Sequence, residues 1–268
     1  MNKNLVYIYS NQTPLSRATQ EELLLLLPSY GLEVSPEYHE GVGLIICIGG
    51  DGTFLNCIHA CRFPETPVVG INTGHLGFFQ EMMPNQLELF LHAYRENQYT
   101  IQEVKPIHAC VSDRSGEHCL YGINEILIQG VRAHIVHFAV NIGETNIQNF
   151  IGDGVLISTA AGSTAYNYSL GGSLVAPDLE ALQLTPVAPM NTNTYRCFRS
   201  SILYPAKNRL SITTMDGTRS DKLHIAHDGF SKEFQSVSRI EIEQSNKPIR
   251  VVRLHSYDYW ANLKSKLL

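Results

Sequence analysis

Short apolar runs and amphipathic segments alternate along the first hundred residues. The apolar runs have the length and β-branched content of buried strands, and they cover 5–10, 44–48 and 67–71. The amphipathic segments have apolar residues at helical spacing, and they cover 16–27, 54–61 and the stretch that begins at Pro84. Because strands that alternate with helices are typical of layered α/β folds, the pattern predicts a Rossmann-like α/β domain over residues 1–104.

From residue 105 onwards the pattern is that of β structure. Eight runs separated by turn residues are predicted to be strands: 107–112, 120–129, 134–142, 155–159, 210–214, 223–226, 240–243 and 249–254. The alternation of Arg-Ile-Glu-Ile-Glu at 239–243 is typical of an antiparallel sheet with one face in water. We therefore expect a β-sandwich domain over 105–254. The tail, 255–268, has three apolar residues at helical spacing, and we expect it to pack back on the first domain.

The pentapeptide Gly-Gly-Asp-Gly-Thr at 49–53 stands between a predicted strand and a predicted helix. α/β folds bind phosphate at such turns, because glycine permits close approach of a ligand and the N–H groups of a helix start favour anions. A carboxylate at Asp51 would repel a phosphate unless it holds a metal ion or accepts a proton. The alternative is a tight turn in which Asp51 caps the helix. The pentapeptide alone leaves both possibilities open.

A second loop, Asn-Thr-Gly-His-Leu-Gly-Phe at 72–78, directly follows the next predicted strand. The carboxyl ends of neighbouring parallel strands meet at one edge of a sheet. We therefore expect the loops 49–53 and 72–78 to face the same site.

Two stretches of the predicted β domain also carry candidate chemistry. The segment 152–166 begins with another Gly-Asp-Gly and ends in small residues, with a helix expected to begin near Ser163 under a Ser or Thr cap. It suits either a planar ligand or a tight strand-to-helix connection. Asn124-Glu125 is polar within an otherwise apolar predicted strand, so at least one side chain needs a buried partner or a ligand. Asp228 precedes a glycine, which mainly indicates a turn. It is a weaker candidate for the site.

Composition narrows the class of protein. The 268 residues carry a formal charge of −5 without a run of Lys or Arg, which disfavours nucleic acid and anionic membrane as partners. No long apolar stretch or signal peptide is evident, and the six cysteines form no Cys-x-x-Cys pair, so we expect a cytoplasmic protein. Cys57 and Cys61 share a helix face that His59 does not, which disfavours a zinc site there. A Walker A loop, a dinucleotide Gly-x-Gly-x-x-Gly after a strand and a Gly-x-Ser-x-Gly elbow do not occur in the sequence.

Taken together, four motifs resemble the NAD kinase family in order and approximate spacing: 49–53, 72–78, Asn124-Glu125 and 152–166. The pentapeptide is shared with diacylglycerol, sphingosine and phosphofructo-kinases, whereas the other three motifs make the resemblance specific. It spans the chain to about residue 254. The short stretch before Gly49 is similar to that of compact Gram-positive members.

The resemblance implies phosphorylation of the 2′-hydroxyl of the adenosine ribose of NAD, giving NADP. ATP or, in some members, polyphosphate is the donor, with a divalent metal such as Mg²⁺ bound mainly through the donor phosphates rather than by a dedicated protein site. It implies a homotetramer or dimer in which a neighbouring subunit helps to build the NAD site. Asp51 would take the proton of the 2′-hydroxyl.

The other implied roles are binding roles. Gly49, Gly50, Gly52 and Thr53 would bind phosphate. NAD would be bound by Gly52, Phe78, Asn124, Glu125, Asp153, Ala161, Thr164, Ala165, Tyr166, Ser169 and Ala188. Within this set Asn124 and Glu125 would contact adenine and ribose, and Asp153 the nicotinamide side.

The sequence departs from the family pattern at two places. Thr-Ala-Ala-Gly at 159–162 replaces the common Thr-Pro-Thr/Ser-Gly, and Ile151 stands where relatives have basic residues. Both departures concern affinity or donor handling. Two alternatives stay open. A diacylglycerol-kinase-like lipid kinase would share the pentapeptide, although the stretches 72–78 and 152–166 argue against it. A non-catalytic NAD(P)-binding sensor is favoured by the altered loop 159–162 alone.

Overall fold

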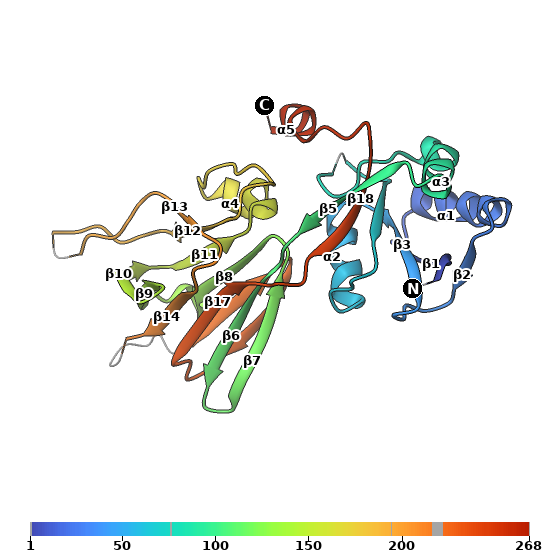
Figure 1. Ribbon diagram of the computed structural model, residues 1–268. Coiled ribbons are helices and arrows are strands. Elements are labelled where there is room, and N and C mark those ends of the chain that lie inside the picture. Colours follow the sequence, from blue (N-terminus) through green and yellow to red (C-terminus); the bar gives the residue numbers. More distant parts are fainter. Residues whose placement is uncertain (1, 76, 194, 216–221, 268) are drawn as a thin grey trace. The chain divides into compact units, whose positions relative to one another are not determined.

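The computed structural model describes residues 2–75, 77–193, 195–215 and 222–267. The chain divides into two compact units, one formed by Met1–Val104 with Pro248–Leu268 and the other by Lys105–Lys247 (Figure 1). Within the described residues, no helix is long and apolar enough to cross a membrane.

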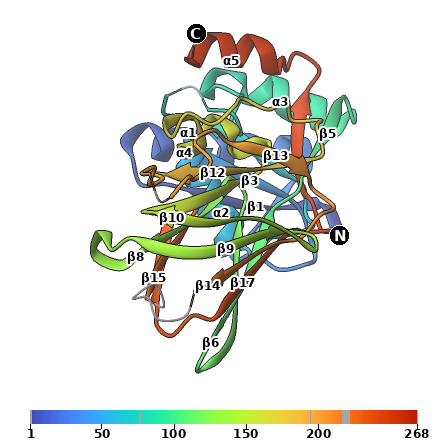
Figure 2. The same ribbon diagram turned by 90° about the vertical axis from the view of Figure 1, so that its left-hand side faces the viewer.

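The first unit contains a six-stranded sheet in the order β2-β1-β3-β4-β18-β5. Its strands are β1 (Asn2–Ser10), β2 (Glu33–Ser35), β3 (Val42–Gly49), β4 (Val68–Asn72), β5 (Tyr99–Val104) and β18 (Ile249–Leu254). All pairs are parallel except the pair of β18 and β5. The helical segments are α1 (Pro14–Leu26), η1 (Leu27–Tyr30), α2 (Asp51–Ala60), η2 (Pro84–Gln86), α3 (Leu87–Arg95) and α5 (Tyr259–Leu267), the red helix near the end of the chain in Figure 2.

Helices cover both faces of this sheet. Leu23 of α1 and Phe90 of α3 share one buried cluster with Ile46 of β3, and α2 lies on the other side of the sheet (Figure 1). On α2, Phe54 stacks on Phe79 with ring centroids 4.7 Å apart. Helix α1 begins earlier than predicted, because Pro14 suits a first helical position and the Thr13 side chain accepts a hydrogen bond from the amide of the third residue.

The second unit contains two antiparallel six-stranded sheets, in the orders β10-β9-β14-β17-β6-β7 and β13-β12-β11-β8-β15-β16. The strands are β6 (Ile107–Asp113), β7 (Gly116–Gly122), β8 (Glu125–Gly130), β9 (Val136–Ile142), β10 (Thr145–Gly152), β11 (Gly154–Ser158), β12 (Ala181–Val187), β13 (Ile202–Pro205), β14 (Leu210–Thr214), β15 (Leu223–His227), β16 (Phe230–Phe234) and β17 (Arg239–Gln244). Three short helical turns complete it: η3 (Val131–Ala133), η4 (Ala161–Thr164) and α4 (Tyr166–Ser169).

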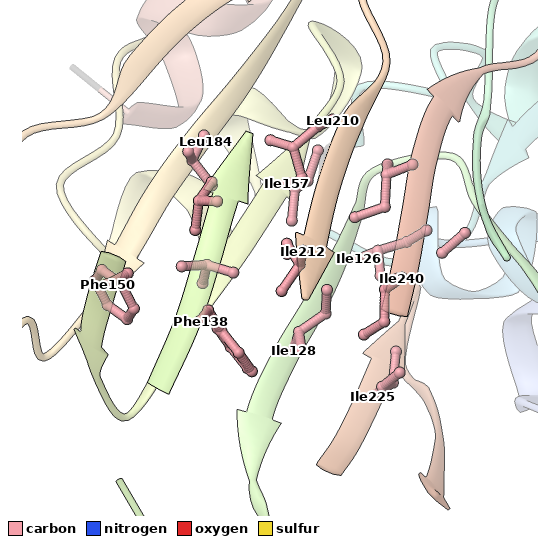
Figure 3. Close-up of a cluster of buried hydrophobic side chains, with 14 of the residues drawn as sticks. Ile126, Ile128, Phe138, Phe150, Ile157, Leu184, Leu210, Ile212, Ile225 and Ile240 are labelled. Atoms are coloured by element: carbon pink, nitrogen blue, oxygen red, sulfur yellow. The ribbon is translucent and has the colours of Figure 1, made fainter. Parts of the chain in front are cut away.

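Alternate residues of both sheets fill the space between them. Ile128 and Ile157 come from one sheet and Phe138, Ile212 and Ile240 from the other, and all five are essentially inaccessible to solvent (Figure 3). Burial of such side chains stabilises the unit by about 1.5–3 kcal/mol each. The predicted fold class, an α/β part and a β-sandwich, is confirmed.

Three local predictions were wrong. The run 120–129 is not one strand, because the chain turns at Ile123 and Asn124 between β7 and β8. Strand β18, predicted to belong to the β domain, pairs instead with β5 and β4 in the α/β sheet. In place of a helix capped near Ser163 there are two short turns, η4 and α4, and neither has a side-chain cap.

Candidate active site

The glycine-rich loop connects β3 to α2. Gly49 ends the strand, Gly50 is the N-cap, and Asp51 is the first residue of the helix, three residues before the predicted start. A side chain at Gly49 would collide with Thr53, whereas Cβ atoms at Gly50 and Gly52 would have no heavy atom within 4 Å. The protein therefore leaves open space beside Gly50 and Gly52, at a helix start where N–H groups favour an anion.

Two backbone amides hold the Asp51 carboxylate. The N–H of Phe78 donates to Oδ2 at 2.8 Å, and the N–H of Phe79 donates to Oδ1 at 3.1 Å. Gly77 has no room for a side chain because Asp51 Oδ1 occupies that space. The capping alternative is therefore wrong, since the helix has no side-chain cap and the carboxylate is bound by another loop.

The loops 49–53 and 72–78 are joined side by side. Gly49 pairs with Asn72 in the parallel ladder, and the Thr73 amide donates to the Gly49 carbonyl at 2.9 Å. Gln80 Nε2 donates to the Gly50 carbonyl at 2.8 Å. The prediction that both loops face one site is confirmed, although Leu76 of the second loop lies outside the described residues.

The C-terminal helix supplies a cation to this site. Lys266 Nζ lies 3.6 Å from Asp51 Oδ2 and 3.9 Å from the centroid of the Phe78 ring. Burial lowers the pKa of Lys266, and the attraction to Asp51 opposes that shift. The tail thus contacts the first unit through α5, where Leu263 is buried but Trp260 is 62% exposed, contrary to the apolar face expected for it.

A buried arginine fixes the loop that holds Asp51. Arg253, 3% exposed, donates to the Phe78 carbonyl at 2.7 Å and to the Phe79 carbonyl at 3.2 Å. It also forms an ion pair with Glu81 at 3.2 Å. Burial raises the pKa of Glu81, and Arg253 opposes that shift. The carbonyl groups of Phe78 and Phe79 thus accept from Arg253, and the amides of the same two residues donate to Asp51.

In the second unit, Asp228 holds the turn that contains Asn124. Its Oδ2 accepts from the Ile123 amide at 2.7 Å and its Oδ1 from the Asn124 amide at 2.8 Å. Asp228 is 6% exposed and has a positive φ of 48°, a conformation that aspartate tolerates better than most residues. A residue that the sequence marked mainly as a turn therefore positions the Asn124-Glu125 pair.

Glu125 is in an environment that disfavours its charge. Burial, together with the negative charge of Asp228, raises its pKa to about 8, and a backbone hydrogen bond from Tyr166 opposes the shift. Among the described residues, buried Oε2 of Glu125 and Oδ1 of Asn124 have no hydrogen-bond partner. Buried polar atoms are nearly always paired, so both atoms are candidates for ligand contacts.

The loop 159–162 docks on the same turn. Thr159 Oγ1 donates to the Ile123 carbonyl at 2.7 Å and accepts from the Gly162 amide at 3.0 Å. A side chain at Gly162 would collide with the Asn124 carbonyl. Ala160 has φ −59°, close to the angle that proline imposes. The backbone angle of Ala160 would therefore also accommodate a proline at this position.

The remaining predicted residues fall into two groups. Ala161, Thr164, Ala165, Tyr166 and Ser169 lie in or beside η4 and α4, with Tyr166 and Ser169 exposed. Of these residues, Tyr166 contacts Glu125 through its backbone amide. Thr164 Oγ1 donates to the Ala161 carbonyl at 3.3 Å, so its hydroxyl is used locally.

Asp153 and Ala188 lie elsewhere. They flank the Gly154–Val187 pair, whereas Glu125 pairs with Ser158 at the other end of β11, about 13 Å away along the strand. Ala188 is exposed and has φ 43°. The structure does not bring these two residues together with Glu125.

Sequence reasoning missed Lys266 and Arg253. Arg253 interrupts an apolar strand, and a charge in such a position is a signal of a buried partner. No sequence signal distinguishes Lys266 from the neighbouring Lys264.

Both parts of the chain match models of a known protein family. The model of the ATP-NAD kinase N-terminal domain matches residues 12–99, and that of the ATP-NAD kinase C-terminal domain matches residues 123–254. The NAD kinase of Finegoldia magna is 31% identical over 100% of this chain and 99% of its own length. The chain belongs to the NAD kinase family. The predicted family resemblance is thereby confirmed.

Other proteins similar to this chain are also NAD or NADH kinases. NAD kinase 1 of Oceanobacillus iheyensis is 30% identical over 90% of either chain. The crystal structure of yeast NADH kinase complexed with NADH has a TM-score of 0.85 at 20% identity, covering 98% of this chain and 87% of the yeast chain. The NAD kinase of Archaeoglobus fulgidus in complex with ATP has a TM-score of 0.75 at 23% identity, covering 98% of both. At these identities the two solved structures establish the fold.

Proposed function

We propose that this protein is an NAD kinase that transfers a phosphoryl group from ATP or polyphosphate to the 2′-hydroxyl of the adenosine ribose of NAD. The observation that carries the proposal is the Asp51 carboxylate, oriented by two amides at a helix start whose glycines leave open space. Family membership supplies the substrate class.

The reaction divides into tasks that these residues suit. Phosphoryl transfer depends on positioning and on neutralising charge, with a group that accepts the proton of the attacking hydroxyl. Asp51 is assigned that proton, and Gly49, Gly50, Gly52 and Thr53 the donor phosphates. Thr53 Oγ1 accepts from Asn11 Nδ2 at 3.1 Å, which orients the hydroxyl beside the loop.

We assign the metal ion to the donor phosphates rather than to a protein site around Asp51. Among the described residues, one cluster brings together three possible metal ligands from His, Cys, Asp or Glu. This cluster is Cys110, Glu117 and Cys119 in the second unit. Mg²⁺ needs few protein ligands when phosphates and water complete its shell, and it supplies charge neutralisation when bound. Asp51 is the carboxylate of the loop available to it.

In the second unit we assign adenosine recognition to the turn and loop around Glu125. The unpaired Oδ1 of Asn124 and Oε2 of Glu125 are acceptors, and an adenosine offers an amino group and ribose hydroxyls as donors. Exposed Tyr166 offers a ring for stacking. Gly52, Phe78, Ala161, Thr164, Ala165 and Ser169 keep their implied NAD contacts in this proposal, as do Asp153 and Ala188 for the nicotinamide side. We further propose that the protein is cytoplasmic and forms a homotetramer or dimer. Light scattering coupled to size exclusion would measure the number of subunits.

The test is an acceptor and donor panel on the purified chain. NAD, NADH and a dispersed diacylglycerol are each offered with Mg²⁺ and either ATP or polyphosphate. We expect the wild type to form NADP. In Asp51→Asn, kcat should fall about 10²–10⁴-fold, the usual contribution of a positioned general base, with little change in KM. Phosphorylation of the lipid alone would support the lipid-kinase alternative. NAD binding without turnover would support the sensor.

A further inference from the structure

Two thiols meet on the outer face of the second unit. Cys110 of β6 stands directly opposite Cys119 of β7, and their Sγ atoms are 2.9 Å apart. The neighbours Ala109 and Val111 point into the core, so Cys110 points away from it. Strand β7 is at the edge of its sheet, and Cys119 is exposed.

The backbone geometry at this pair suits a covalent bond. Residues directly opposite in antiparallel strands have Cα atoms about 4.5–5.5 Å apart. Disulfides need a Cα separation of about 4.4–6.8 Å. The Cα separation expected for this pair therefore falls within the range that a disulfide needs.

The two thiols have different tasks. Cys110 is half-buried, and burial, contact with Cys119 and the charge of Glu117 raise the pKa of its thiol. Cys119 is exposed and reaches solutes first. This difference in exposure assigns the first attack to Cys119 and the second to Cys110.

We propose that Cys110 and Cys119 are a reversible dithiol–disulfide site that reacts with small uncharged disulfides. The Cys119 thiolate attacks one sulfur of the small disulfide, whose S–S bond breaks and releases one small thiolate. Cys110 then loses its proton to solvent and attacks Cys119 Sγ, which releases the second small thiolate. Two protein thiols become one disulfide, two electrons reduce the small disulfide, and two small thiols form after protonation. The carboxylate of Glu117 lies within 4.8 Å of both sulfurs and disfavours an anionic reagent, a repulsion that an uncharged disulfide avoids.

A metal ion is the competing occupant of this pair. Cys110, Glu117 and Cys119 could offer three ligand atoms. Two sulfurs bound tetrahedrally at about 2.3 Å from zinc would be about 3.8 Å apart. The observed 2.9 Å is closer than that and favours direct sulfur–sulfur bonding.

The test treats the full chain with bis(2-hydroxyethyl) disulfide and maps it with trypsin without reduction. Arg114 separates the two cysteines, so Cys110 falls in peptide 96–114 and Cys119 in peptide 115–132. We expect these peptides to be joined, and to separate on adding dithiothreitol. Cys110→Ser should stop at the mixed disulfide on Cys119, whereas Cys119→Ser should react at least about tenfold more slowly, because its remaining thiol is less accessible to solutes.

Two results would overturn the proposal. One is that both thiols remain open to iodoacetamide after treatment, with no joined peptide. The other is that the reduced protein retains one equivalent of added zinc in native mass spectrometry and this zinc blocks the cross-link, which would make the pair a metal site. Hydrogen exchange gives a separate measure, since the disulfide should slow exchange in β6 and β7 of the wild type and not in either serine variant.

Discussion

The two units present carboxylates in opposite situations. Asp51 in the first unit accepts from two amides and has Lys266 3.6 Å away. Glu125 in the second unit is buried beside another carboxylate, and its Oε2 has no partner among the described residues. The contrast teaches that a carboxylate fixed by the protein suits proton transfer at a set position, whereas one left short of partners suits a ligand that brings donors.

The largest effect on stability is expected from Arg253, because it orients the peptides that hold Asp51. Arg253→Met would leave Glu81 buried without its cation, which destabilises by about 3–5 kcal/mol. Urea unfolding measures this. Arg250→Met on the same strand is the matched control, since that side chain is exposed. A loss equal to that of the control would show that Arg253 does not fix this loop.

The Glu125 side of the comparison predicts a pH effect. Its pKa is about 8 in the folded protein and 4.5 ordinarily. Between these values the unfolded chain releases a proton that the folded chain keeps, so the free energy of unfolding falls as pH rises and levels off above pH 8. Glu125→Gln should remove this fall. Between pH 5 and pH 8.5 the free energy of unfolding of the variant should therefore rise by more than about 1 kcal/mol relative to that of the wild type. Exposed Glu233→Gln should change nothing.

Ligand binding gives an independent view of the same group. Ribose hydroxyls that donate to Glu125 favour its charged form, so NAD binding below pH 8 should release a proton. Calorimetry in two buffers of different ionisation enthalpy measures that release, and Glu125→Gln should abolish it. Equal heats in both buffers for the wild type would contradict the assigned contact.

A smaller effect concerns the loop beside Glu125. Ala160 already has the φ of proline, so Ala160→Pro should stabilise by about 0.4–1 kcal/mol by restricting the unfolded chain. Ala160→Gly should shift thermal unfolding in the opposite direction. Destabilisation by proline would mean that the loop needs the freedom that alanine allows.

The smallest effect is expected at the cation beside Asp51. Lys266→Met removes a partly exposed ion pair, worth about 0.2–1 kcal/mol. Faster hydrogen exchange in α5 would report it, with Lys264→Met as the control. No difference between the two variants would remove Lys266 from the contacts that dock the tail.

Local patterns predicted the parts of the fold that depend on neighbours in sequence. The strand before Gly49, the helix after it and the meeting of loops 49–53 and 72–78 follow from apolar periodicity and parallel topology. The placement of β18 could not be predicted this way. Its apolar residues suit either kind of sheet, and its pairing with the distant β4 and β5 decides.

The sequence predicted which residues belong to the site better than it predicted which contacts hold them. Asn124 was expected inside a strand, but Asp228, 104 residues away, draws its amide into a turn. Similarly, Asp51 as a helix cap was reasonable from the sequence, but the amides of Phe78 and Phe79 bind the carboxylate. Both outcomes depend on contacts between segments far apart in the chain, which local propensity does not encode.

The central claim is that Asp51 serves the chemical step and Glu125 serves binding. Single-turnover phosphorylation of saturating NAD by Asp51→Asn and by Glu125→Gln, measured side by side, tests it most directly. The account predicts a rate about 10²–10⁴-fold below wild type for Asp51→Asn, and for Glu125→Gln a rate near that of wild type with a raised KM for NAD. A near-normal rate in Asp51→Asn, with the loss appearing in Glu125→Gln, would contradict it.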